Sequence, residues 1–546
     1  MVATSRRPNK PKLPVKKRPT KAASRKAAST SAAGAVQVSA WENDPFSQAV
    51  PTDPPLLATP ILRPAPVLSP TDPLPIKIDT PPPKPAGQFS PGTAEFRYWT
   101  AAEALRRAGD FWNKIAGVTK WFRSVGKILP VTLDAGVDFN AFYDRHELEF
   151  FHGSVAGFGT VFSGESPDIV CHELGHAILD TLRPPLFNAG FIEVAAFHES
   201  FGDMSAILSA LQLQPVRLHV LAETHGNLSR SSSLSRLAEQ LGFAIRKINA
   251  AAVERDCLRN AANSFFYRDP STLPPSAPAS ALSSEPHSFS RVFTGAFLDV
   301  LAGLLNVRVA RNIPTEADLL QVSEKAANYL VKAIGSAPVI PAYYSQIAAA
   351  MVNAADPSDK NAVAGGFVHH GILSLPAAAA AVARKTTMTA VMRKAGKGRD
   401  DLDKIAIPAA EYGFLAESVL VNGASEEGDR YDVTGAAFAA GSLPTVPSDR
   451  GAKDFLEDLL QLGRVEFGKK RVGVAAFGSP FAQPSKRKTH KLVKDGQAVR
   501  LVRLGFDCGF DCGCCGPYIL ITKDYDKKAK GDQGFSEKNF GTESYD

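Results

Sequence analysis

Apolar residues recur at helical spacing in the stretch 93–117. Residues three and four apart share one side of a helix, so the apolar side of this segment is expected to face a core. The residues on that side are Ala104, Leu105, Ala108, Phe111, Trp112 and Ile115. The pattern predicts a long amphipathic helix near the start of a folded domain.

Short apolar runs follow this helix and predict β-strands. They cover 128–133, 138–143 and 148–153, and the last two flank a turn. Glycines between 153 and 164 predict a loop before the next helix. Further helices are predicted at 316–336 and 342–354, and the Ala-rich stretch 373–384 is expected to close the domain. These elements assign residues 93–384 to one domain.

A smaller module is predicted over 405–524, after a polar linker at 385–404. Apolar runs in the module predict strands at 414–421, 431–434, 471–477 and 499–504, and a helix at 453–462. The charged, Gly-rich segment 525–546 is expected to be a flexible tail.

Four of the six cysteines cluster within this module, at Cys508, Cys512, Cys514 and Cys515. Their spacing differs from that of a zinc ribbon. Soft-metal binding or a redox pair is one interpretation, and thiols without a special role or simple disulfides are the other. The two remaining cysteines, Cys171 and Cys257, have no evident partner, so no disulfide framework is implied.

The positive charge of the chain is concentrated at its N-terminus. Residues 1–40 carry ten Lys or Arg and no acid, while the whole chain has a net charge of +7, which leaves about −3 for the remainder. Proline is dense from 51 to 85, which favours an extended linker. We therefore predict a disordered basic and Pro-rich arm at 1–92. The composition favours a solubilising tail over weak electrostatic contact with nucleic acid or an anionic membrane.

Hydropathy and targeting signals exclude some classes of protein. The chain has 44% hydrophobic residues, which is enough for sizeable cores, but no run of 18 apolar residues. Its basic N-terminus lacks the apolar segment of a secretory signal. We expect a monomer without a membrane span, and the cytoplasm is the default compartment.

The chemistry concentrates at residues 172–176, which read His-Glu-Leu-Gly-His in a chain with 11 histidines. Residues four apart share a helix face, so His172 and His176 are directed at one point. Glu199 on a following helix supplies a carboxylate to the same point. Two nitrogens and one oxygen leave a fourth position for water, as in catalytic zinc sites. Glu173 would lie beside that water and take its proton.

The alternative interpretation is a helix whose two histidines face solvent or a polar core. The neighbouring residues argue against it, because a polar pair on a buried helix needs partners. These apolar neighbours are Ile169, Val170, Leu174, Ala177 and Ile178.

With these residues the chain resembles the thermolysin-like zinc metallopeptidases, gluzincins whose third metal ligand is a glutamate. Residues 140–143, Asn-Ala-Phe-Tyr, resemble the family's Asn-Ala-Phe-Trp edge strand. Residues 198–203, His-Glu-Ser-Phe-Gly-Asp, resemble its Asn-Glu-Ala-x-Ser-Asp segment. The resemblance implies that Asn140 and the backbone of Ala141 bind a peptide substrate.

Two later segments extend the resemblance. Residues 256–259, Asp-Cys-Leu-Arg, resemble the segment whose arginine binds the substrate carbonyl beyond the cleavage point, which implies that role for Arg259. Residues 287–290, His-Ser-Phe-Ser, resemble the family's His-x-x-Ser, whose histidine donates to the oxyanion, which implies that role for His287. Taken alone, each residue has a simpler interpretation: Arg259 as a surface charge, His287 as a polar helix cap and Asn140 as a turn residue. The order of the segments along residues 95–375 gives the resemblance its weight.

The resemblance implies an α+β fold with two lobes over 93–384. The first lobe would contain a sheet, the second would be mainly helical, and the metal would lie in the cleft between them. Asp203 would hydrogen-bond His172, which fixes the tautomer of that ligand and raises its basicity.

The chain also departs from the family pattern. The family has a tyrosine between its second histidine and its third ligand, but no tyrosine lies between His176 and Glu199. Family members are secreted and carry calcium. Asp168 stands where one calcium ligand would, but no other member of the family's acidic cluster can be matched, which argues against calcium.

The resulting interpretation is an endopeptidase that holds one zinc ion and acts on peptide or protein substrates, with Glu173 as general base. A catalytically weak or inactive zinc-binding fold for protein interaction is the first alternative, suggested by the absent tyrosine. A nucleic-acid or redox adaptor built on the basic arm and the cysteines is the second.

Overall fold

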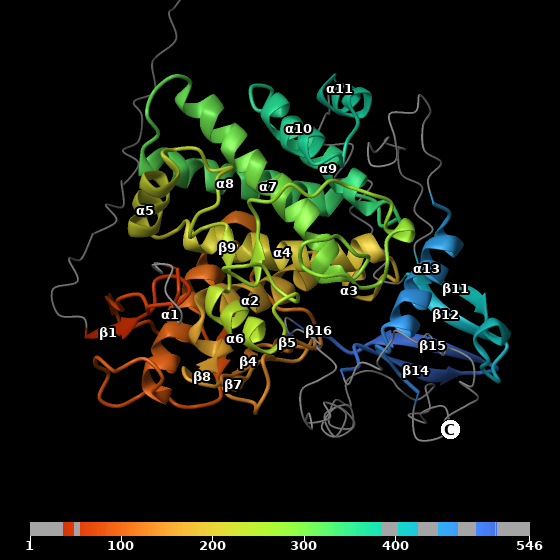
Figure 1. The fold of residues 1–546 in the computed structure, drawn as a ribbon, viewed down its shortest axis with the longest axis horizontal. Coiled ribbons are helices and arrows are strands. Elements are labelled where there is room, and N and C mark those ends of the chain that lie inside the picture. Colours follow the sequence, from red (N-terminus) through yellow and green to blue (C-terminus); the bar gives the residue numbers. More distant parts are fainter. Residues whose placement is uncertain are drawn as a thin grey trace, which may run out of the picture. The chain divides into compact units, whose positions relative to one another are not determined.

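The computed structural model describes residues 36–47, 55–383, 402–423, 446–467, 487–507 and 509 (Figure 1). Some predictions lie outside these residues: the basic segment 1–35, the strands at 431–434 and 471–477, most of the linker, the tail, and Cys508, Cys512, Cys514 and Cys515. Within the described residues the fold is α+β, with helices and several small sheets.

Folded structure begins well before Thr93, so the prediction of a disordered arm over 1–92 is wrong for 36–47 and 55–92. Strands β1 (Gln37–Ala40) and β2 (Ile61–Pro64) pair antiparallel, and β3 (Ile76–Ile78) joins a larger sheet. Trp41 is 2% exposed and lies edge-on against Phe96. The dense prolines concealed β2 and β3, whereas β1 precedes them and was assigned to the basic arm; each strand has only three or four residues, too few for a clear pattern.

The predicted first helix is confirmed as α1 (Ala94–Ala116). The Thr93 side chain accepts a hydrogen bond from the Phe96 backbone N–H at its start, and Gly117 ends it in the left-handed conformation. The predicted strands are also confirmed, as β4 (Leu129–Thr132), β5 (Ala141–Tyr143) and β6 (Leu148–Phe150). The predicted glycine loop is instead a hairpin of two strands, β7 (His152–Val155) and β8 (Gly159–Phe162).

Strands β5, β6, β4 and β3 are consecutive neighbours in a five-stranded sheet whose order is β16-β5-β6-β4-β3. The fifth member, β16 (Phe506–Asp507), comes from the far end of the described chain. It pairs antiparallel with β5, with Phe506 opposite Tyr143 and Asp507 opposite Phe142. Without β16, strand β5 would be the edge of this sheet.

Helices α2 and α4 lie between the N-terminal strands and the later helices α7, α8, α9 and α10 (Figure 1). The predicted helices at 316–336 and 342–354 are confirmed as α8 and α9, and the Ala-rich stretch contains the helix α11. The helices after α1 are α2 (Pro167–Leu182), α3 (Pro185–Asn188), α4 (Ile192–Ala210), α5 (Gln214–Thr224), α6 (Glu239–Ile248), α7 (Pro286–Val309), α8 (Glu316–Ser336), α9 (Tyr343–Ala354), α10 (Lys360–His369) and α11 (Leu375–Ala383).

Among the described helices, α7 alone has the length and apolar composition of a membrane span. Within that apolar stretch, 72% of the residues are buried inside the protein, which a core helix also shows. A two-stranded pair, β9 (Arg236–Leu237) with β10 (Arg259–Asn260), lies between α5 and α7 in the sequence.

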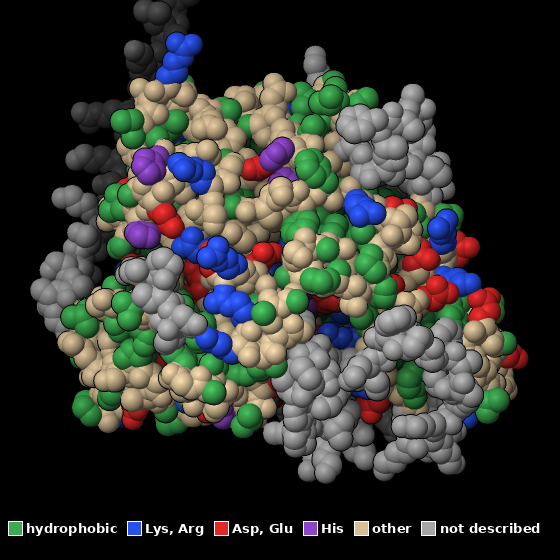
Figure 2. Space-filling view, viewed as in Figure 1, with side chains coloured by type: hydrophobic (Ala, Val, Ile, Leu, Met, Phe, Trp, Pro, Cys, Tyr) green, Lys and Arg blue, Asp and Glu red, His purple; other side chains and the backbone are tan. Residues whose placement is uncertain are grey.

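The C-terminal module contains a second five-stranded sheet in the order β11-β12-β15-β14-β13. Its first strand begins at Asp403, inside the predicted linker, and its helix begins at Ser448 rather than at Lys453. The predicted strand at 414–421 is shorter and shifted. The elements are β11 (Asp403–Pro408), β12 (Ser418–Gly423), α13 (Ser448–Gln461), β13 (Val465–Glu466), β14 (His490–Asp495) and β15 (Ala498–Arg503). Acidic and basic side chains lie beside one another on the visible face of the molecule (Figure 2).

Candidate metal centre

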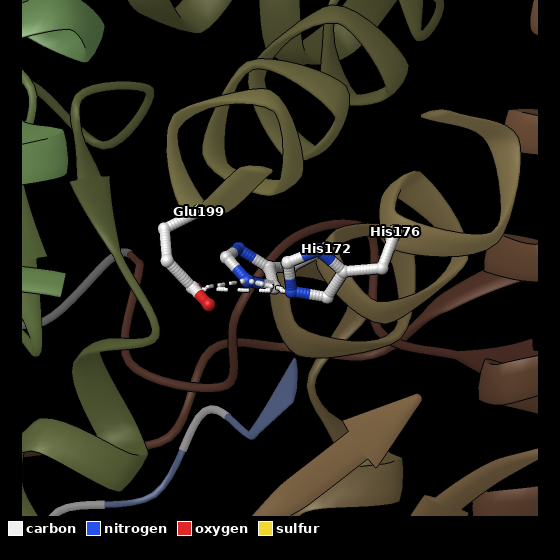
Figure 3. A group of neighbouring side chains, drawn as sticks. All are labelled: His172, His176 and Glu199. Carbon is white, nitrogen blue, oxygen red and sulfur yellow. Dashed lines mark hydrogen bonds and ion pairs between the residues drawn. The ribbon is translucent and has the colours of Figure 1, made fainter. Parts of the chain in front are cut away.

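Helices α2 and α4 bring three predicted ligands to one point. His172 and His176 lie one turn apart on α2, and Glu199 faces them from α4 (Figure 3). The Nε2 atoms of the two histidines are 3.1 Å apart. Oε2 of Glu199 lies 3.3 Å from Nε2 of His172 and 3.8 Å from Nε2 of His176. All three side chains are at most 4% exposed.

These distances fit a tetrahedral metal ion. Ligand atoms about 2.0–2.2 Å from zinc at tetrahedral angles lie about 3.3–3.6 Å from one another, and the three observed separations bracket that range. Two imidazole nitrogens and one carboxylate oxygen are a donor set that zinc prefers. The three residues could therefore hold a zinc ion with small adjustments.

The hydrogen bonds around the histidines turn their Nε2 lone pairs toward this point. Nδ1 of His172 lies 3.0 Å from Oδ1 of Asp203 and donates to it, and in the neutral form of the ring Nε2 then has a lone pair. Nδ1 of His176 lies 2.8 Å from Nδ1 of His198. A His176 tautomer protonated at Nδ1 donates to His198 and likewise leaves its Nε2 with a lone pair. Burial, reinforced by neighbouring positive charges, lowers the pKa of both His176 and His198 and keeps these rings neutral.

Close packing of the two helices places the His172 ring. A side chain at Gly202 would lie 2.5–2.6 Å from ring atoms of His172, so the absence of a Cβ at this position lets the ring approach α4. Gly175 has the same effect on the other helix, where a Cβ would lie 2.8 Å from Cβ of Ser205.

Asp203 lies where the sequence predicted it, behind His172. Its carboxylate also accepts hydrogen bonds from Nη2 of Arg259 at 2.8 Å and from Nε of Arg259 at 3.2 Å. Burial alone would raise the pKa of Asp203, but Arg259 and His172 outweigh it and hold the pKa well below its usual range. Arg259 is 7% exposed and so is not a surface charge. Its observed contact is with Asp203, and substrate binding by Arg259 stays a prediction.

Glu173 follows His172 on α2 and is fully buried. His287 lies in the first turn of α7, and its Nε2 is 3.3 Å from Oε2 of Glu199. Nδ1 of His287 donates to Glu285 at 2.7 Å, and Nε2 donates to the backbone oxygen of Asp507 at 2.5 Å. Burial would lower the pKa of His287, but the carboxylates of Glu199 and Glu285 outweigh it and raise the pKa to about 10. His287 is therefore a double donor aimed at the same point as the ligands.

The predicted substrate-binding residues Asn140 and Ala141 lie at the start of β5, and both are buried. The backbone oxygen of Asn140 accepts a hydrogen bond from the Ser163 hydroxyl at 2.7 Å. Oδ1 of Asn140 has no hydrogen-bond partner among the described residues and lies 2.5 Å from the place a Cβ of Gly509 would take.

Asp168 belongs to a second buried group, with Asp44 and Glu239. Their candidate ligand oxygens all lie within 4.8 Å of one another. Burial, reinforced by the neighbouring Asp44, raises the pKa of Asp168 to about 8. An all-oxygen set suits a hard cation such as calcium better than it suits zinc. The two partners were missed in the sequence because they come from distant segments, one of them in the supposed arm.

No protein-family model matches the chain, and no curated protein matches it. The residues of the site must therefore be interpreted on their own geometry. Two of them were missed in the sequence, His198 and Phe506. His198 adjoins a predicted ligand, which was a usable signal, whereas nothing near Phe506 indicated that it would reach the site.

Proposed function

We propose that this protein is a zinc-dependent endopeptidase of the thermolysin-like type, with the zinc ligands in a cleft between a sheet-containing lobe and a helical lobe. The observation that carries the proposal is the convergence of His172, His176 and Glu199 at tetrahedral separations, with Glu173 on the same helix. A structural zinc site would close all four positions, whereas three ligands leave room for water and substrate.

Bound zinc would supply a Lewis acid that polarises water and the scissile carbonyl. Glu173 accepts the proton of the attacking water and delivers it to the leaving amine. His287 donates from Nε2 to the oxygen on which negative charge develops, while Glu285 fixes the ring through Nδ1. Asp203 fixes His172, and Arg259 holds Asp203 in place.

The proposal is tested first on metal binding. Purified protein should contain one zinc ion that is lost in His172→Ala. A second group, Asp299, His369 and His370, also contains potential metal ligands, so His369→Ala at its exposed histidine is the matched control and should retain the zinc. Zinc that survives His172→Ala would place the metal elsewhere and contradict the proposal.

Catalysis is tested with a quenched peptide library at high enzyme concentration. The measured quantity is the difference in cleavage rate between the wild type and Glu173→Gln. This substitution removes the proposed general base and leaves the proposed zinc ligands unchanged. Cleavage that depends on Glu173 and is abolished by a chelator supports the proposal, whereas equal cleavage by Glu173→Gln refutes the assigned mechanism. Phe506 stacks on the proposed ligand His176, so the variant Phe506→Ala is assayed as well. A protein that binds zinc at this site but cleaves no peptide, either as the wild type or as Phe506→Ala, would support the alternative of a zinc-binding interaction fold.

A further inference from the structure

The C-terminal module sends a strand into the candidate metal centre. Strand β16 lies along β5, the strand predicted to bind substrate, in antiparallel register. Extended peptides commonly bind proteins in this way, by adding a strand to a free sheet edge. Gly505 makes the approach close, because a Cβ there would lie 2.9 Å from the backbone oxygen of Tyr143.

Phe506 fills the space beside the metal ligands. Its ring stacks on His198 with centroids 4.0 Å apart and on His176 with centroids 4.9 Å apart. Phe187 meets the ring edge-on at 5.4 Å, and the side chain of Phe506 is 2% exposed. The guanidinium carbon of Arg503 lies 4.2 Å from the centroid of the same ring. An aromatic side chain of the protein itself is thus enclosed beside the proposed metal ligand His176.

The residue after Phe506 accepts a hydrogen bond from His287, the predicted oxyanion donor. The backbone carbonyl of Asp507 accepts the Nε2 hydrogen bond of His287, the contact expected for a substrate carbonyl. The Asp507 side chain lies 3.6 Å from Nη1 of Arg464 and 3.9 Å from Nη1 of Arg487. Arg487 in turn pairs with Asp138, just before β5. Through Arg487, the end of the strand is therefore linked electrostatically to the residues just before β5.

The connection between the strand and its module is short. Only Leu504 and Gly505 separate β15, in the sheet of the module, from β16. The module is anchored beside the site as well: the backbone N–H of Gly190 donates to the backbone oxygen of Asn422 at 2.8 Å. Movement of the module would therefore withdraw the strand.

We propose that the C-terminal module is an intramolecular inhibitor, whose residues Gly505–Asp507 occupy the position of a peptide substrate. This inference rests on the proposed endopeptidase function. The three metal ligands are at most 4% exposed with the strand in place, so a polypeptide reaches them only after β16 leaves. The occupant also indicates the substrate class, an extended chain with an aromatic residue in the pocket formed by His176, His198 and Phe187.

The test uses the full-length, zinc-loaded protein and two variants that weaken the strand differently. Phe506→Ala empties the aromatic pocket, and Gly505→Val places a side chain against β5. Phe414→Ala is the matched control, since Phe414 is a buried phenylalanine of the same module whose ring contacts are Tyr412 and Phe467. Peptide cleavage is measured together with the rate at which a chelator removes the zinc.

Both readouts should rise roughly ten-fold or more in Phe506→Ala and Gly505→Val, because buried aromatic anchors dominate such contacts. Phe414→Ala should match the wild type. Faster zinc removal without cleavage in any variant would refute the peptidase and still support occupancy of the site by the strand. Either of two results would overturn the inhibitor proposal. One is a rate of zinc removal that is the same in the wild type and both variants, and the other is a wild type that cleaves peptides as fast as both variants.

Discussion

Replacing Asp203 by asparagine should weaken zinc binding and lower the stability of the fold, and comparison with two companion variants should separate these effects. The substitution keeps the shape of the side chain and removes its negative charge. Asp203 accepts hydrogen bonds from His172 at 3.0 Å and from Arg259 at 2.8 and 3.2 Å. The same carboxylate therefore orients a proposed metal ligand and neutralises a buried guanidinium.

The two effects have different expected sizes. Loss of a carboxylate behind a metal-binding histidine weakens metal affinity by about 10–100-fold, or about 1.4–2.7 kcal/mol. Breaking a buried ion pair costs about 3–5 kcal/mol of unfolding free energy, because the partner charge stays buried. We expect both losses in Asp203→Asn. The double variant Asp203→Asn with Arg259→Gln should recover part of the stability and none of the zinc affinity.

Asp180 offers a matched control. It is a fully buried aspartate on α2 that accepts hydrogen bonds from Arg145 at 2.6 and 3.0 Å and from the Tyr143 hydroxyl. None of these partners is a proposed metal ligand. Asp180→Asn should lose comparable stability and keep its zinc affinity.

Zinc affinity is measured by competition with a fluorescent chelator, and stability by urea unfolding of the metal-free proteins. Equal zinc affinity in Asp203→Asn and the wild type would refute the argument. So would an equal loss of affinity in Asp203→Asn and Asp180→Asn, which would show that general loosening of the helices is responsible.

Three further predictions follow from single side chains. Trp41→Ala should lower the unfolding free energy by about 3–5 kcal/mol in urea titrations, because the indole is buried in the core, whereas a disordered segment would show no change. His287→Gln should lower kcat by roughly 10²–10³ with a smaller effect on KM, measured on a strand-released variant; an unchanged kcat would exclude it as the oxyanion donor. Burial raises the pKa of Glu193 to about 8 from 4.5, so the folded state binds this proton more tightly and stability should fall as the pH rises between these values. Glu193→Gln should flatten that decline in urea midpoints, and an equal slope would contradict the assignment.

Local patterns were enough to predict the elements that carry the metal ligands. The i, i+4 spacing of His172 and His176 depends only on helix geometry, and apolar periodicity defined α1, α8 and α9 to within a few residues. Helix geometry also places Asp203 one turn after Glu199 on α4, whereas its position behind His172 was implied by the family resemblance.

Long-range pairing could not be predicted in this way. Strand β3 pairs with β4 although dense prolines surround it, and the sequence alone gave no register between them. Asp44 and Glu239 reach Asp168 from segments that share no pattern with it. Strand β16 has only two residues, too few for any periodicity, and its partner lies more than 360 residues earlier in the chain.

The candidate metal centre is enclosed by protein, whereas the proposed hydrolysis requires a polypeptide substrate to reach it. Two imidazole lone pairs and a carboxylate facing one another in a dry interior are stabilised by a bound cation, which favours an enclosed site. Hydrolysis of a polypeptide requires the same atoms to meet a bulky substrate. A removable cover satisfies both demands, and β16 has suitable properties: it pairs over only two residues with β5, and a short connection ties it to a separate sheet. Loss of so short a pairing leaves β5, β6, β4 and β3 paired as before, although release of the strand must also break the stacking of Phe506 on His176 and His198.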